Sequence, residues 1–137
     1  MGQKAPPWAK KLIINAQAET VAEKPTFKQA YSSQRCIVPC TGWYEWRDVG
    51  GSRKQRYAFS HVDGTPFLMA GIWFGEPFHA GLVTLTTKPL ARCADIHHRM
   101  PLLIDPQDAE LWLTAPVAEV GPMMTTTGED HIAIERA

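Results

Sequence analysis

The sequence predicts a β-rich α+β domain with few short helices, and three observations support this fold class. The 11 prolines and 10 glycines are scattered along 137 residues, as in proteins whose short strands are joined by turns. Several short runs are rich in β-branched and aromatic side chains, which favour strands. Helix-terminus signals occur in two places. The length suits a single domain over residues 1–137 with its own hydrophobic core.

The first third of the chain is predicted to alternate strand and helix. After an irregular lead-in over residues 1–11, the apolar run "LIINA" at 12–16 predicts a short buried strand. Residues 25–33 are expected to form a helix with Thr26 as its N-cap. The run "RCIVPCTGWYEW" at 35–46 then predicts a strand. This strand is expected to be broken at two residues, Pro39 and Gly42.

The middle of the chain carries the signal of a β-hairpin. Asp63 and Gly64 form the dipeptide that supplies a tight two-residue turn, and a strand-like run lies on each side of it. The two runs are "RYAFSHV" at 56–62 and "TPFLMAGIWF" at 65–74. A further run rich in β-branched residues, "AGLVTLTT" at 80–87, predicts another strand.

A second helix is predicted at residues 105–113. Asp105 is suited to be its N-cap, and Pro106 fits the first helical position. Beyond this helix the pattern weakens, so residues 114–137 are expected to form a mobile tail.

The composition excludes several classes of protein. With 45% hydrophobic and 20% charged residues the chain is expected to be globular rather than disordered. Lys+Arg and Asp+Glu are 14 each, so no net charge indicates nucleic-acid binding, although a local basic patch remains compatible with it. No apolar run reaches the length of a membrane span, and three cysteines without a CxxC pair predict reduced thiols. We therefore expect a cytoplasmic protein with no membrane partner.

Three polar stretches are candidates for chemistry. In "NAQAET", alternation places Asn15, Gln17 and Glu19 on one face, either as an exposed edge or as side chains that converge on a polar ligand. In "CTGWYEW", Glu45 lies among aromatic residues, so it either points to solvent on an edge or is held in a pocket. In "IHHRMP", histidine is suited to proton transfer and Arg99 to phosphate binding, but a solvated turn is the alternative. No spacing predicts a metal site, and no cofactor is expected.

Taken together and in order, these stretches resemble the SRAP family, the SOS-response-associated peptidases, which sense abasic sites in single-stranded DNA. The stretches that carry the resemblance are "INAQAET", "RCIVPCTGWYEW", "MAGIWF", "TLTT" and "IHHRMP", followed by a helix ending in "LWL", over about residues 8–113. The resemblance implies a twisted, barrel-like mixed sheet with a DNA groove. It also implies an N-terminal cysteine that forms a thiazolidine with the ring-opened abasic aldehyde and takes part in self-processing.

The resemblance also assigns roles to individual residues. Asn15 matches a polar contact to the sugar remnant, Glu45 a glutamate that handles protons, and His97 the histidine that assists ring opening. His98 falls at a variable position and is expected to face solvent. The implied DNA contacts are Arg99, Trp46, Thr87, Gln17 and Trp8. A Glu45 carboxylate packed against aromatic rings is expected to have a raised pKa and to share one pocket with His97 and Asn15.

Two departures from the family pattern carry expectations. The family begins Met-Cys-Gly-Arg, whereas this chain begins "MGQK", and only Pro7, Trp8 and Ala9 match the family before its first motif. We therefore expect an SRAP-like domain that lacks its N-terminal segment and is impaired in crosslinking, because Gly2 has an amine but no thiol. Gln17 stands where the family usually has arginine, which is expected to weaken DNA binding. The alternatives are a non-catalytic single-stranded DNA binding module and an inactive remnant; the sequence leaves the oligomeric state open.

Overall fold

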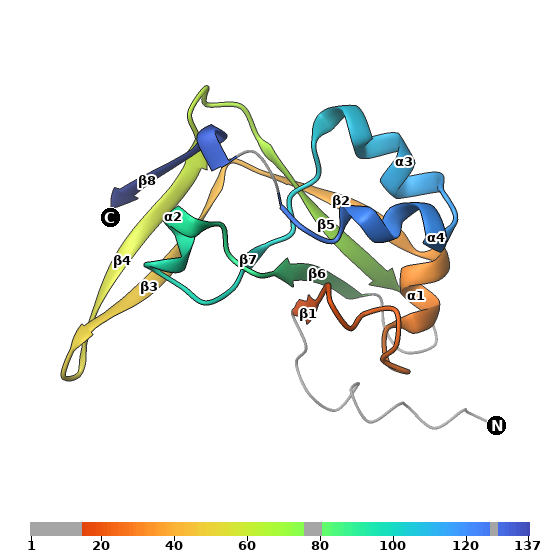
Figure 1. The fold of residues 1–137 in the computed structure, drawn as a ribbon, viewed down its shortest axis with the longest axis horizontal. Helices are drawn as coiled ribbons and strands as arrows, with labels where there is room; N and C mark the ends of the chain where they lie inside the picture. The colour runs from red at the N-terminus through yellow and green to blue at the C-terminus, as the bar shows by residue number, and fades with distance from the viewer. Residues whose placement is uncertain (1–14, 76–80, 127–128) are drawn as a thin grey trace.

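The computed structural model describes residues 15–75, 81–126 and 129–137. These residues form two β-sheets with short helices around them (Figure 1). The first sheet has five strands: β1 (Asn15–Gln17), β2 (Arg35–Cys40), β5 (Phe67–Phe74), β6 (Gly81–Thr87) and β7 (Met100–Pro101). The second has three: β3 (Gly42–Gly50), β4 (Arg53–His61) and β8 (Ile132–Arg136). The predicted α+β class with few short helices is confirmed.

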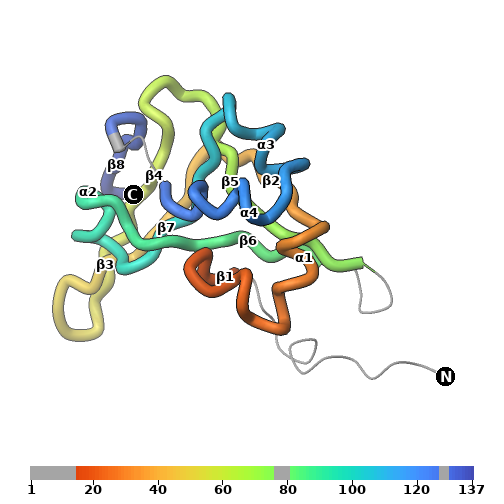
Figure 2. The backbone as a smooth tube through the Cα atoms, turned by 45° about the vertical axis from the view of Figure 1, so that its right-hand side comes forward, coloured from red at the N-terminus to blue at the C-terminus, as the bar shows by residue number. Residues whose placement is uncertain are grey.

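The strand order of the first sheet is β1-β6-β5-β2, with β7 paired to β6. β1 runs parallel to β6, and the two lie side by side in Figure 2, whereas the other pairs of this sheet are antiparallel. The second sheet is antiparallel throughout, in the order β3-β4-β8. Both sheets have open edges within the described part of the chain. The expectation of a barrel-like sheet is therefore wrong, since neither sheet closes on itself.

The helices are all short. The α-helices are α1 (Lys28–Ser33), α2 (Ala91–Ala94), α3 (Ala109–Thr114) and α4 (Val117–Val120). The 3-10 helices are η2 (Pro106–Asp108), η3 (Gly121–Met123) and η4 (Glu129–His131). At the start of η2, the side chain of Asp105 accepts a hydrogen bond from the backbone N–H of Gln107, as predicted for this cap. Thr26 was expected to cap the first helix, but the helix begins later, after Phe27, and has no side-chain cap.

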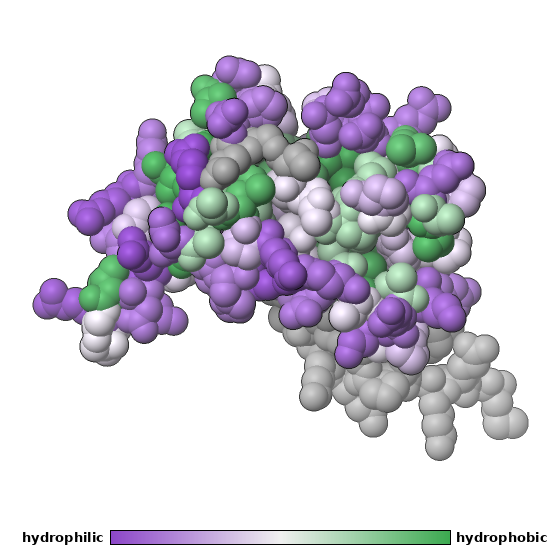
Figure 3. All heavy atoms as spheres, viewed as in Figure 1, coloured by the Kyte–Doolittle hydropathy of each residue, from purple (hydrophilic) through white to green (hydrophobic). Residues whose placement is uncertain are grey.

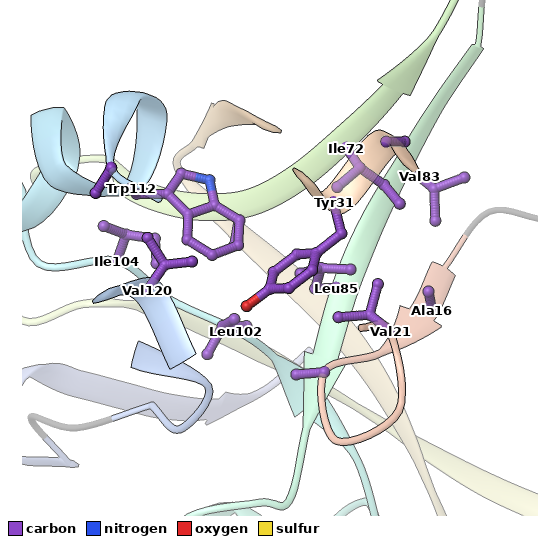
Figure 4. Packing of buried hydrophobic residues seen from close by; sticks show 14 residues of the cluster. Ala16, Val21, Tyr31, Ile72, Val83, Leu85, Leu102, Ile104, Trp112 and Val120 are labelled. Carbon is purple, nitrogen blue, oxygen red and sulfur yellow. The ribbon is translucent and has the colours of Figure 1, made fainter. Parts of the chain in front are cut away.

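One face of the first sheet is covered by α1, α3 and α4, and the main hydrophobic core lies between them (Figure 4). Trp112 of α3 is completely buried there, and its indole N–H donates to the backbone oxygen of Cys36. The buried guanidinium of Arg35 donates to the backbone oxygens of Tyr31, Trp112 and Ala115, which satisfies carbonyl groups at the ends of two helices. This packing leaves the opposite face of the sheet free to form a site.

The predicted hairpin around Asp63 and Gly64 does not exist. The chain does turn there, with Gly64 at a φ of 74° and its N–H donating to the carbonyl of His61. However, the strands on either side belong to different sheets: β4 pairs with β3 and β8, whereas β5 pairs with β2 and β6. The hairpin of this region is β3–β4, whose turn has glycines 50 and 51 at positive φ.

The strand predicted at 35–46 is divided once, at Thr41, into β2 and β3. Pro39 lies inside β2, opposite Leu68, and does not interrupt it. It is tolerated because β2 is an edge strand, where a missing backbone N–H breaks no ladder on the open side. The expected strand at 12–16 is described from Asn15 onward, and residues 1–11 and 12–14 lie outside the described residues.

The expectation of a mobile tail after Leu113 is also wrong for the described residues of this segment. They form α4, η3, η4 and β8, and β8 pairs with β4 from Tyr57 to His61. Ile132 of β8 is buried in a second, smaller core beneath the second sheet, with Phe59, Phe67, Cys93 and Met100. Among the described residues, no helix is both long and apolar enough to cross a membrane.

Candidate functional site

A cavity of about 470 Å³ opens between the free face of the first sheet, strand β3 and the segment that follows α2. It is lined by residues from all three regions: Asn15, Gln17, Trp43, Tyr44, Glu45, Met69, Thr84, Thr86, His97, His98, Arg99, Met100 and Pro101. The predicted site residues Asn15, Gln17, Glu45, His97 and Arg99 are all among them. The stretches "NAQAET", "CTGWYEW" and "IHHRMP" therefore meet at one place, although they are far apart in the sequence.

Alternation along β1 brings Asn15 and Gln17 to the cavity. Ala16 between them is buried in the main core, so its two neighbours project from the opposite face. The parallel pairing sets Asn15 beside Thr84 and Gln17 beside Thr86 on β6. Two amides and two hydroxyls thus form a polar wall on the sheet.

Glu45 comes from the edge strand β3. The sequence left two alternatives for it, a solvent-facing edge position and a pocket position, and the structure has features of both. Its side chain is 23% exposed, so it is neither fully buried nor free in solvent. Burial raises the pKa of the Glu45 carboxyl, while the charges of His97 and, to a smaller extent, His98 lower it. The net direction is upward. Glu45 is therefore a pocket carboxyl on an edge strand, and it holds its proton to a higher pH than an exposed glutamate does.

His97 lies beside this carboxyl, with its Nε2 atom 3.7 Å from Oε2 of Glu45. Its Nδ1 atom is 3.0 Å from the backbone oxygen and 3.2 Å from the backbone nitrogen of Arg99; with the ring proton on Nδ1 it donates to that oxygen and leaves Nε2 able to accept. The backbone of Arg99 thus fixes the orientation of the imidazole. The geometric prediction that Glu45, His97 and Asn15 share one pocket is confirmed; their catalytic roles stay predictions.

Arg99 is held by Glu19 and Thr86. Its Nη1 and Nη2 atoms donate to the Glu19 carboxylate at 3.0 and 2.6 Å, and Nη2 also donates to the backbone oxygen of Thr86 at 2.8 Å. The Nε atom is 3.3 Å from the Thr86 hydroxyl. The hydrogen bond from Arg99 holds the pKa of Glu19 below its ordinary value. Arg99 is the residue predicted to bind a phosphate, but its charge is already balanced by Glu19 in a bidentate ion pair.

The remaining predicted DNA contacts have different fates. Trp46 is 53% exposed, but it lies on the face of β3 opposite to Glu45. On that face the Arg56 guanidinium is 4.7 Å from the ring centre of Tyr44 and 5.9 Å from that of Trp46. Thr87 is 1% exposed and its hydroxyl donates to the backbone oxygen of Met124, so the prediction of a DNA contact there does not fit the structure. Trp8 lies outside the described residues.

Sequence reasoning missed Thr86 as a residue of the site. Thr86, rather than its neighbour Thr87, faces the cavity, and the alternation of β6 carries that information once Leu85 is known to be buried. His98 is exposed as expected, but its ring centre lies 4.6 Å from that of His97. Trp43 lines the cavity and stacks on Phe59, and its buried indole N–H has no hydrogen-bond acceptor among the described residues.

The arrangement is suited to proton transfer. A carboxyl with a raised pKa next to an imidazole provides an acid and a base within one water-accessible cavity. Within the described ranges, no group of three or more His, Cys, Asp or Glu side chains is placed to hold a metal ion. None of the three cysteines forms a disulfide within the described residues.

The fold and site define a small α+β domain with a carboxyl–imidazole pair in a polar cavity. The sequence matches the family described as SOS response associated peptidase (SRAP) over residues 3–136, and the chain belongs to this family. It is 34% identical over 119 residues to the abasic site processing protein YoqW of Bacillus subtilis, which covers 79% of this chain and 53% of YoqW. The abasic site processing protein YedK of Escherichia coli is 33% identical over 116 residues, 81% of this chain and 51% of YedK.

Solved structures agree with this assignment. A crystal structure of a protein from Bacteroides thetaiotaomicron superposes with a TM-score of 0.80 at 30% sequence identity, and the match covers 89% of this chain and 57% of that one. The chain thus spans about half the length of the curated relatives that it matches.

Proposed function

We propose that the cavity recognises abasic sites in single-stranded DNA in the manner of the SRAP family. The observation that carries this proposal is the Glu45–His97 pair, 3.7 Å apart, in a cavity that Asn15 also lines. The two relatives above are named abasic site processing proteins, and this chain carries the family's motifs in order.

The chemistry of an abasic site explains why such a pair is needed. The sugar is mostly a closed hemiacetal, and opening it to the aldehyde moves a proton from the anomeric hydroxyl to the ring oxygen. One group must accept the first proton while another donates the second. A protonated Glu45 is suited to donate, and His97 in its neutral form is suited to accept. Condensation of an amine with the aldehyde then releases water: the proton that the attacking amine loses returns to the Glu45 carboxylate, which then protonates the departing hydroxyl.

Two further groups support recognition of a sugar remnant. Asn15 and Gln17 present amides to the cavity, and either amide can donate to or accept from a sugar hydroxyl. We propose a preference for single strands because a residue that occupies the cavity must leave any duplex stack.

A second candidate function is a binding module for intact single-stranded DNA. Tyr44 and Trp46 are 60% and 53% exposed, and with Arg56 they form an aromatic and cationic surface on the outer face of β3–β4. Bases stack on such surfaces without sequence preference. This candidate needs no chemistry at Glu45.

One binding experiment separates the two candidates. Fluorescence anisotropy is measured with a single strand that carries one tetrahydrofuran abasic analogue, with the intact strand and with the intact duplex. Abasic-site recognition requires tighter binding to the first, and Asn15→Ala should remove that preference whereas Lys28→Ala on α1 should not. Equal affinity for abasic and intact strands would instead favour the binding module.

The covalent step is tested separately with a natural abasic strand and borohydride, which reduces an imine to a stable link. We expect Glu45→Gln and His97→Gln to slow any trapping, while Glu23→Gln, an exposed carboxylate after β1, serves as the matched control. Trapping at equal rates in all four proteins would exclude the pair from the reaction.

A further inference from the structure

We propose that Arg47 and Arg136 form a phosphate-binding subsite beside the cavity, on the face of the second sheet that carries Glu45. The ligand is a phosphodiester group of the DNA strand near the residue that occupies the cavity. This inference rests on the proposed function, because it states where the strand runs once it leaves the cavity.

The strand register places the subsite. Tyr57 of β4 is paired with Glu45 of β3 on one side and with Arg136 of β8 on the other, so the three side chains stand in one row on one face. Arg47 follows Glu45 by two positions on β3 and therefore projects from the same face. The carboxyl of the cavity and two guanidinium groups thus lie on neighbouring positions of one surface.

The two arginines share a neutral partner. Tyr57 stands beside Arg136 in the register, and the nearness of Arg136 and then of Arg47 holds the pKa of Tyr57 below its ordinary value. A phenol hydroxyl can accept a hydrogen bond from a guanidinium group without cancelling its charge, as a carboxylate would. In the described part of the chain, neither Arg47 nor Arg136 makes an ion pair with a carboxylate, and both are exposed.

Arg99 is in the opposite situation. It also reaches the cavity, but the Glu19 carboxylate already occupies the side of its guanidinium that would clasp a phosphate. A phosphate that approached Arg99 would have to displace this carboxylate or meet its negative charge. Within the described ranges, Arg47 and Arg136 carry positive charge on the Glu45 face without a carboxylate partner, although the sequence singles out Arg99.

The subsite also has a suitable place in the fold. The β3–β4 ribbon projects from the body of the protein, and hydrophilic side chains dominate its projecting end (Figures 1 and 3). A strand that enters the cavity at Glu45 can continue along β3 toward Arg47. Two guanidinium groups on one face of the sheet can each present a planar pair of N–H donors to the oxygens of one phosphate or of two successive ones.

The test is the salt dependence of binding to a short single-stranded oligodeoxynucleotide with one tetrahydrofuran abasic analogue. We expect Arg47→Gln with Arg136→Gln to reduce the slope of log K against log salt by about 1.4, because each lost contact to a single-strand phosphate removes about 0.7. Relative to about 1 M salt, this corresponds to a loss of roughly 60-fold in affinity at about 50 mM.

The matched control removes two cations elsewhere, by Lys24→Gln with Lys28→Gln at and before α1. This control lowers the net charge equally but should change the slope much less. The conservative pair Arg47→Lys with Arg136→Lys should restore most of the slope. All of these side chains are exposed, and circular dichroism verifies that each variant is folded.

Each outcome decides one question. Equal slopes for the Arg47/Arg136 variant and the lysine control would overturn the subsite, even if the strand still binds. A wild-type protein that binds abasic and intact strands equally, yet loses slope in the arginine variant, would retain the subsite and contradict abasic recognition. A wild-type protein that binds neither strand would overturn both.

Discussion

Replacing Glu45 by glutamine is expected to stabilise the protein at neutral pH and to leave its stability unchanged in acid. Burial raises the pKa of the folded Glu45 carboxyl above its ordinary value of 4.5, so between the two pKa values the folded state binds more protons than the unfolded state. This contribution to stability is fully present below the unfolded pKa and is lost as the pH rises through the folded pKa. Glutamine has a similar shape and does not titrate, so the variant avoids that loss.

The size of the effect follows from the surroundings of the carboxyl. Each unit by which the folded and unfolded pKa values differ amounts to about 1.4 kcal/mol. The side chain is 23% exposed, so water reduces the penalty, and an imidazolium of His97 at 3.7 Å offsets about 1 kcal/mol of it in a water-like dielectric. Because burial outweighs both histidine charges, we expect a net gain on the order of 1 kcal/mol for Glu45→Gln at neutral pH.

The assay is urea unfolding followed by tryptophan fluorescence at a series of pH values from about 4 to about 8. The measured quantity is the difference in free energy of unfolding between Glu45→Gln and the wild type. It should start near zero in acid and rise to a plateau. The exposed control Glu23→Gln should show no such rise. A difference for Glu45→Gln that is flat or falls with pH would refute the assignment of a buried, proton-retaining carboxyl.

Three further predictions concern the same cavity. His97→Gln should raise the pKa of Glu45 further, because the larger of the two opposing charges is removed; carbon-13 NMR titration of the carboxyl measures this, and an unchanged midpoint would show that the groups are not coupled. Glu19→Gln should free the charge of Arg99, strengthen single-stranded DNA binding and steepen its salt slope by about 0.7, and an unaltered slope would contradict this. Trp43→Phe replaces the indole that lines the cavity by a smaller phenyl ring, so it should weaken binding of the abasic strand; unchanged anisotropy would show that this wall of the cavity does not contact the DNA.

The sequence was most informative where the evidence was local or where several motifs combined. The strands at 35–46 and 80–87, the cap at Asp105 and the pocket of Asn15, Glu45 and His97 are all present, with the boundary changes described above. Alternation and capping are properties of neighbouring residues, so they can be read without knowledge of the fold. The pocket could be predicted because the order of five motifs, not any one of them, carried the resemblance.

The pairing of strands that are distant in the sequence could not be predicted from local patterns. Asp63 and Gly64 do form a turn, but a turn dipeptide does not state which sheet each flanking strand will join. The second partner of β4, besides β3, is β8, whose residues 132–136 have a weak pattern because an edge strand of five residues needs only one buried face. The burial of Ile132 against Phe59 and Phe67 supplies the stabilisation that the local sequence does not reveal.

Which arginine binds DNA depends on whether neighbouring carboxylates balance its charge. A sequence motif does not show those neighbours. Arg99 was selected because its residue type and position match a phosphate ligand, but its charge is neutralised by Glu19, 80 positions away in the sequence. Arg47 and Arg136 were not selected, because nothing in their local sequence distinguishes them from solvated surface arginines. Only the register of three strands shows that they flank the same tyrosine and the same face as Glu45. An arginine contributes to binding an anion through the charge that its neighbours leave uncompensated, and the neighbours are fixed by the fold.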